Sequence, residues 1–157
     1  MSSWSEIDNA LKTIKKNKVI LMQCTSSYPC KDTDVGLNVL KEMRKKYGNK
    51  YKYGFSDHSI GSEAAICSLA YGAEYIEKHI TFSKKMYGSD AKFAMEPDEF
   101  YEFCKSLRRT KVLIKSKINK NNIKPFIKMK ETFEKKIVAK IKINKGKKCT
   151  DLKEKKI

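Results

Sequence analysis

The sequence predicts an α/β fold in which parallel strands alternate with helices. An apolar run of strand length lies at 18–24, and further short strands are expected at 51–55 and 73–80. A run without polar alternation fits a strand buried on both faces, and strand–helix alternation implies right-handed crossovers and a parallel sheet. Three such units after one helix amount to half of a (β/α)8 barrel, a fold that takes about 250 residues, whereas this chain has 157.

Helices are expected before and between these strands. The first begins with the capping-box pattern Ser3-x-x-Glu6, followed by apolar residues at helical spacing. The second is amphipathic and ends at Gly48, and the last begins with Pro97, a residue suited to a first helical turn. The expected helices start at Ser3, span 34–48 and 63–71, and start again at Pro97.

The character of the chain changes after the last expected helix. Residues 117–135 have no clean period and are predicted to form a linker. Residues 136–150 alternate apolar and polar side chains, which is the period of a half-exposed strand. We therefore expect a half-barrel domain over 1–116, the linker, and the start of an incomplete β-rich domain over 136–157.

The formal net charge of +17 raises the possibility of a nucleic-acid binder. The distribution of charge argues against it, because residues 111–157 hold 17 of the 35 basic residues, and only three of the 35 are arginine. Base and phosphate recognition depends strongly on arginine forks. We expect a solvated, lysine-rich surface; steep salt dependence of binding to any DNA or RNA would indicate the alternative.

Cysteine usage and hydropathy predict a cytoplasmic protein. The five cysteines are odd in number and never spaced C-x-x-C, so they are expected to be free thiols in a reducing compartment. Cys24 is expected to be a small core residue, because no basic partner is evident beside it. The chain has no apolar segment long enough for a membrane span and no secretory signal at its N-terminus.

The two histidines, His58 and His79, each follow an expected strand, and these strands are consecutive. Neighbouring strands lie about 4.8 Å apart, and active sites of parallel α/β folds gather at the carboxyl ends of strands. Two imidazoles there could bind one divalent ion. They suit an ion that keeps open coordination positions, such as Mn²⁺, Mg²⁺ or Co²⁺, better than they suit a structural zinc ion. Alternatively, each histidine only forms hydrogen bonds within its own loop.

Other polar residues cluster near these histidines in the sequence. Asp57 directly precedes the first, and Glu77 shares a strand face with the second. Either carboxylate could accept a hydrogen bond from a histidine ring and so orient it. Alternatively, Glu77 could be a buried carboxylate paired with a lysine. Ser26 and Ser56 follow the first two strands and supply donors that suit phosphate or carboxylate.

Four motifs occur in order within residues 18–110: QCTSSYP (23–29), GFSDHSIG (54–61), EKHIT (77–81) and YGSDAKFAMEPDEF (87–100). They closely resemble the sialic acid synthase family, which includes N-acetylneuraminate, legionaminate and pseudaminate synthases and spore-coat relatives. The segment 136–150 is similar to the opening strand of the antifreeze-like domain that follows the barrel in this family.

The resemblance implies condensation of phosphoenolpyruvate with an N-acetylated hexose such as N-acetylmannosamine, with release of phosphate. It places His58 and His79 at the positions of the family's metal ligands. Mn²⁺ is the metal expected, with Mg²⁺ or Co²⁺ as alternatives. The metal would polarise the open-chain aldehyde of the sugar.

The resemblance also implies substrate contacts. Ser26 and Ser56 match positions that contact the phosphate of phosphoenolpyruvate. Tyr28 and Asp90 match positions that meet the sugar, and Ala91 stands where many members carry histidine, which leaves the sugar preference open.

The lysines that bind phosphoenolpyruvate in the family, and its catalytic glutamate, belong to the first half of the barrel and match nothing here. No catalytic residue is therefore assigned. We expect this chain alone to be inactive or marginally folded unless a separate N-terminal half complements it; the full-length family forms homodimers. The alternatives are another 3-deoxy-sugar-acid synthase or aldolase, an inactive remnant, and a basic binding protein.

Overall fold

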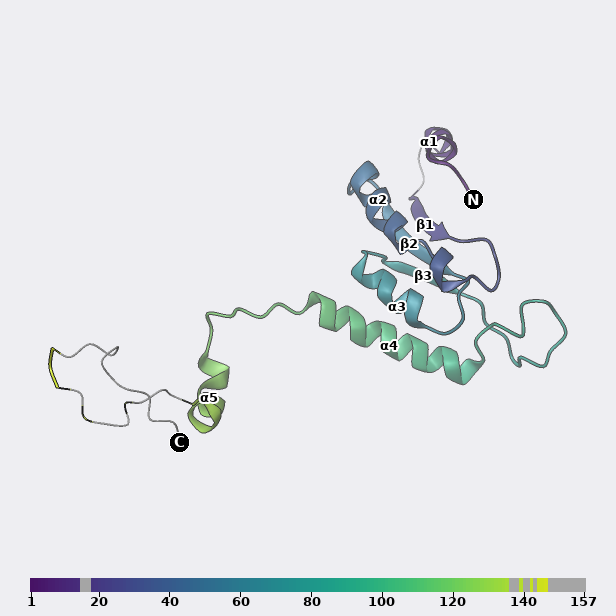
Figure 1. Cartoon of the computed structure of the whole chain (residues 1–157). Coiled ribbons are helices and arrows are strands. Elements are labelled where there is room, and N and C mark those ends of the chain that lie inside the picture. Colours follow the sequence, from purple (N-terminus) through teal and green to yellow (C-terminus); the bar gives the residue numbers. More distant parts are fainter. Residues whose placement is uncertain (15–17, 136–138, 140–141, 143, 147–157) are drawn as a thin grey trace. The chain divides into compact units, whose positions relative to one another are not determined.

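The computed structural model divides into two compact units, Met1–Ser116 and Lys117–Ile157. The first unit contains three strands that alternate with helices (Figure 1). The described residues are 1–14, 18–135, 139, 142 and 144–146.

The strands of the first unit form one parallel sheet in the order β1-β2-β3. The prediction of parallel strands alternating with helices is thereby confirmed. In chain order, the elements are α1 (Trp4–Thr13), β1 (Ile20–Cys24), the 3-10 helix η1 (Asp32–Asp34), α2 (Leu37–Tyr47), β2 (Lys52–Asp57), α3 (Glu63–Ala70), β3 (Tyr75–Lys78) and α4 (Pro97–Lys115).

The helix ends follow the sequence signals closely. Ser3 caps α1 in a capping box with Glu6, as predicted, and α2 ends at Gly48, whose positive φ of 61° favours glycine. Pro97 opens α4 in the first turn. The expected start of α2 is too early, because η1 is a separate turn and Gly36 takes a left-handed φ of 69° directly before the helix.

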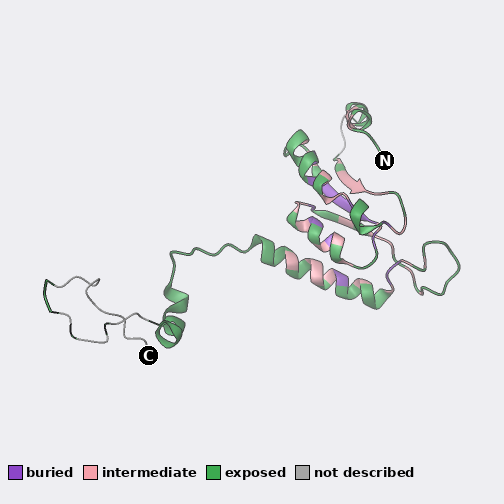
Figure 2. Ribbon diagram, viewed as in Figure 1, coloured by how far each residue is buried: buried purple, intermediate pink, exposed green. Residues whose placement is uncertain are grey.

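The core lies between the sheet and the helices that follow its strands. Phe55 of the central strand meets Leu40 of α2, Ala65 of α3 and Phe103 of α4 in one buried cluster. Figure 2 shows β2 as the most buried strand of the sheet. Side chains along a strand point alternately to the two sides of the sheet. We call the side toward these helices the helix face and the opposite side the site face.

The strand limits differ from those expected. β1 and β3 are shorter than predicted, whereas β2 continues past Phe55 to Asp57. Asp57 is expected in the polar loop after the strand 51–55, but it lies within β2. It continues the strand because its backbone pairs with Lys78 of β3 and its side chain finds partners inside the protein.

In the second unit, the stretch expected to be a linker contains the 3-10 helix η2 (Lys124–Phe126) and the helix α5 (Ile127–Phe133). Pro125 lies in the first turn of η2, where its missing N–H costs no hydrogen bond. The predicted strand at 136–150 falls largely outside the described residues. No helix among the described residues is long and apolar enough to cross a membrane.

Candidate functional site

The two histidines lie side by side at the carboxyl end of the sheet. His58 directly follows β2 and His79 directly follows β3. Their ring centroids are 5.1 Å apart, with the ring planes at 84° to each other. Both side chains are only partly buried. The structure thus brings together the two imidazoles that the sequence placed on consecutive strands.

Backbone hydrogen bonds hold both histidines just beyond the strand ends. The carbonyl oxygen of His58 accepts from the amide of Cys30 at 2.7 Å, and that of His79 accepts from the amide of Met95 at 3.0 Å. Each bond belongs to a short parallel bridge to a returning loop segment. The loops after β1 and β3 therefore fix the main chain from which the imidazoles project.

Tyr28 packs against both imidazoles. Its ring stacks on His79 with a centroid distance of 4.4 Å and meets the edge of His58 at 5.3 Å. Burial raises the pKa of the Tyr28 phenol, and the negative charges of Asp90 and Asp57 raise it further. The phenol therefore stays neutral and able to donate a hydrogen bond.

Asp90 and Cys24 complete the immediate surroundings of the histidines. The Asp90 Oδ2 atom lies 3.6 Å from Nδ1 of His79, and its side chain is 57% exposed. The Cys24 Sγ atom lies 3.9 Å from both ring nitrogens of His58. The expectation that Cys24 has no basic neighbour is wrong, because the pairing of β1 with β2 places this thiol opposite Ser56 and next to the histidine.

Ser56 and Glu77 form a second polar pair on the site face. They are register partners, and the Ser56 hydroxyl donates to Oε1 of Glu77 at 2.7 Å. Glu77 is exposed, so the alternative of a buried carboxylate paired with lysine does not describe it. Ser26 is exposed in the loop after β1. It has no contact with this pair among the described hydrogen bonds.

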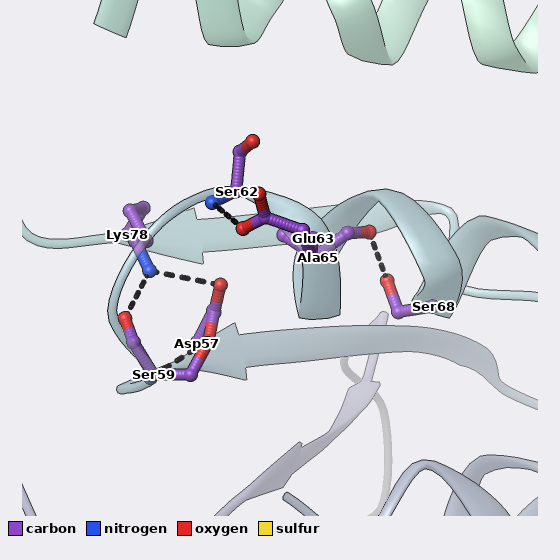
Figure 3. Close-up of polar contacts among 7 residues, drawn as sticks. All are labelled: Asp57, Ser59, Ser62, Glu63, Ala65, Ser68 and Lys78. Atoms are coloured by element: carbon purple, nitrogen blue, oxygen red, sulfur yellow. Dashed lines mark hydrogen bonds and ion pairs between the residues drawn. The ribbon is translucent and has the colours of Figure 1, made fainter. Parts of the chain in front are cut away.

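The buried carboxylate–lysine pair belongs to Asp57 instead. Its Oδ2 atom lies 2.9 Å from Nζ of Lys78, and the two side chains are 0% and 3% exposed. Figure 3 shows both side chains turned toward each other between β2 and β3. Sequence reasoning missed Lys78, although a lysine in an expected strand of a parallel sheet, directly before His79, signals the need for a charged partner.

The adjacent imidazoles of His58 and His79 could supply two ligands to a metal ion. Among the described residues, no group of three or more His, Cys, Asp or Glu side chains has metal-holding geometry. A closed structural site with four protein ligands is therefore not formed by this part of the chain. Two adjacent imidazoles fit an open site, in which water and substrate oxygens complete the coordination.

Known proteins share this fold and sequence. The NeuB family model matches residues 1–119. An uncharacterized protein of Methanocaldococcus jannaschii is 37% identical over 119 residues, which are 74% of this chain and 35% of that protein. The N,N'-diacetyllegionaminic acid synthase of Campylobacter jejuni is 32% identical over 151 residues, 93% of this chain and 44% of the enzyme.

A solved structure agrees with the sequence matches. The N-acetylneuraminic acid (sialic acid) synthetase of Leptospira borgpetersenii, crystallised with citrate, superposes with a TM-score of 0.70 at 31% identity, covering 86% of this chain and 48% of that one. The chain thus spans less than half the length of these relatives. The family model covers the whole first unit and more than half of the chain, so the chain belongs to the NeuB family.

Proposed function

We propose that this chain forms the C-terminal half of the barrel of a nonulosonic acid synthase. The reaction is the condensation of phosphoenolpyruvate with an N-acetylated hexose, with release of phosphate. The observation that carries the proposal is the pair of imidazoles on neighbouring strand ends, 5.1 Å apart, with Tyr28 and Asp90 beside them. This pair lies within the residues that match the NeuB family.

In this proposal, His58 and His79 hold a divalent cation, with Mn²⁺ preferred and Mg²⁺ or Co²⁺ as alternatives. Imidazole with oxygen ligands suits such ions, whereas thiolate-rich sites select softer ones. When bound, the cation supplies Lewis-acid polarisation of the sugar aldehyde oxygen. The stacked ring of Tyr28 restricts the orientation of His79.

Tyr28 and Asp90 recognise the sugar in this proposal. The Tyr28 phenol is neutral, because burial raises its pKa, and can donate to a sugar oxygen. The Asp90 carboxylate is more than half exposed and can accept hydrogen bonds from sugar hydroxyls. N-acetylmannosamine and the amino sugars that lead to legionaminate or pseudaminate all satisfy this chemistry.

The phosphate side is supplied by hydroxyl groups and by residues outside this chain. Ser26 is exposed and can donate directly to a phosphate oxygen. Ser56 already donates its proton to Glu77, so a contact from Ser56 to phosphate requires that hydroxyl to turn away from the carboxylate. Glu77 thereby decides whether the Ser56 hydroxyl is available. The lysines that contact phosphoenolpyruvate would come from the first half of the barrel.

Titration of the full chain with Mn²⁺ tests the metal part of the proposal. We expect the parent chain to bind Mn²⁺ and the variants His58→Ala and His79→Ala to bind at least tenfold more weakly, because each removes a ligand. Asp8→Ala serves as the control, since Asp8 contacts Lys46 and Tyr47 of α2 and no residue of the site. Equal affinity in all four chains would refute the metal site.

Phosphate release tests the reaction. The full chain is mixed with the separately expressed N-terminal half of the Campylobacter jejuni legionaminic acid synthase, phosphoenolpyruvate, Mn²⁺ and each of several N-acetylated hexoses. We expect turnover only when both halves are present, and with one of the amino sugars. A folded complex of both halves that releases no phosphate with any sugar would refute the proposed reaction, and turnover by this chain alone would refute the need for a second half.

A further inference from the structure

We propose that Asp57 and Lys78 are positioning residues whose buried ion pair sets the spacing of His58 and His79. The functional consequence, metal binding, rests on the function proposed above, whereas the structural link can be measured without a metal. The proposal concerns the helix face of the sheet, opposite the side on which the imidazoles lie.

The ion pair joins the last residues of two neighbouring strands. Asp57 and Lys78 are register partners at the ends of β2 and β3. The Lys78 ammonium donates to Oδ2 of Asp57 at 2.9 Å and to the carbonyl oxygen of Ser59. The Lys78 side chain is 3% exposed and the Asp57 side chain 0%. Solvent therefore screens their charges less than it screens those of a surface ion pair.

The second carboxylate oxygen fixes the turn that follows β2. The Asp57 Oδ1 atom accepts from the amide of Ser59 at 2.9 Å and from its hydroxyl at 2.7 Å. Figure 3 shows Asp57, Ser59 and Lys78 as one closed group of contacts. Both partners of the ion pair thus contact Ser59, the residue directly after His58, so the main chain of this histidine is held on both sides.

The position of this group explains its effect on the imidazoles. His58 and His79 are the next residues along each strand, so a lateral link between positions 57 and 78 fixes the two points from which the rings project. The link on the site face is weaker, since it is one hydrogen bond from Ser56 to the exposed Glu77. Among the side-chain contacts, the buried pair is therefore the stronger lateral link at the strand ends, in addition to the backbone pairing of β2 with β3.

Stability alone does not explain a buried ion pair. Apolar residues of similar volume often stabilise a protein equally well, and the best-attested use of buried polar groups is to specify register. Asp57 and Lys78 end two neighbouring strands, and each directly precedes a candidate metal ligand. At this position, the register of the strands affects the distance between the two histidines. Supporting groups behind metal ligands commonly change affinity by 10- to 100-fold.

The test compares three variants of the full chain with the parent. Lys78→Met removes one charge. The double variant Asp57→Asn/Lys78→Met removes both, so it leaves no unpaired buried charge and keeps the proposal testable if the single variant fails to fold. Met43→Val is the control, because Met43 is buried on α2 and takes part in none of the hydrogen bonds of the Asp57–Lys78 group.

Two measurements are made on each chain. The first is hydrogen exchange of the Cys30 and Met95 amides without metal, because these amides bond to the carbonyl oxygens of the two histidines. The second is Mn²⁺ affinity. For the double variant we expect exchange at both amides at least tenfold faster than in the Met43→Val control, and Mn²⁺ binding at least tenfold weaker.

The outcomes separate this proposal from the proposed function. Unchanged exchange at both amides in the double variant would overturn the positioning role, as would unchanged affinity in a chain that binds Mn²⁺. Faster exchange in the double variant, together with a parent chain that binds no Mn²⁺, would support the structural link and refute the metal site instead.

Discussion

The two faces of the β2–β3 strand ends differ in what their charged side chains contact. On the helix face, Asp57 and Lys78 are almost completely buried and neutralise each other. On the site face, Glu77 is exposed and His79 retains 33% of its side-chain exposure. One residue step along the strand therefore separates a charged side chain with fixed protein partners from one that solvent can reach.

This difference shows how a strand end can serve structure and chemistry together. Side chains alternate between faces, so a residue that secures the backbone can directly precede one that acts on a ligand. In the proposed function, the sequence pairs Asp57-His58 and Lys78-His79 both follow this order. If the division holds, variants on the helix face should change stability, and should change binding only by displacing the strand ends. Variants on the site face should change binding directly, with little loss of stability.

The largest loss of stability is expected for Phe55→Ala on the helix face. Phe55 is 2% exposed and lies in the buried cluster with Leu40 and Phe103. Deleting such a ring removes apolar burial and leaves a cavity, at a cost of about 3–5 kcal/mol. Urea unfolding followed by circular dichroism measures this, and a loss below about 1 kcal/mol would contradict the assigned core.

Lys78→Met should destabilise the chain by about 3 kcal/mol, because it leaves the buried Asp57 carboxylate without its counter-charge. Adding Asp57→Asn should recover most of that loss, since both charges are then gone. The same unfolding experiment measures both variants. A double variant no more stable than the single one would show that the contacts, and not the charges, determine the cost.

A smaller effect is expected from Ser56→Ala on the site face. This change removes the hydrogen bond to Glu77 and should cost about 1 kcal/mol, because Glu77 is exposed and can bind water instead. In the two-half assay, it should raise the apparent KM for phosphoenolpyruvate. A loss as large as that of Phe55→Ala would remove the distinction between the faces.

The smallest effect is expected at the surface contact between α1 and α2. Hydrogen bonds from Lys46 and Tyr47 lower the pKa of the Asp8 carboxyl below its ordinary value of 3.8. Stabilisation by this carboxylate is thus present above about pH 4 and is lost as the pH falls through the lowered pKa. The parent should exceed Asp8→Asn in stability at pH 7, with the difference shrinking toward pH 2; a constant difference would contradict the linkage.

Local signals in the sequence were sufficient for most of the fold. The capping box at Ser3, the stop at Gly48 and the proline at the start of α4 correctly mark helix ends, because each acts through neighbouring backbone groups. The placement of His58 and His79 at the ends of consecutive strands also follows from local pattern, since parallel strands share their carboxyl edge.

Contacts that depend on register or on a returning loop were not predictable in this way. The Asp57–Lys78 pair exists because β2 and β3 align those two residues on the helix face. Likewise, the Cys24 thiol meets His58 because β1 pairs beside β2. A one-residue slip in either pairing would move these side chains to the opposite face, and no local pattern excludes that slip.

Spacing along the chain was enough to predict the order of strands and helices and most helix ends. It was also enough to predict that the two histidines lie at neighbouring strand ends. Only the tertiary structure decided which carboxylate is buried with a lysine, which stays exposed, and that Tyr28 stacks on His79. The physical reason is that burial and partner choice are set by residues 20 or more positions away, brought close only when the sheet and its loops have formed.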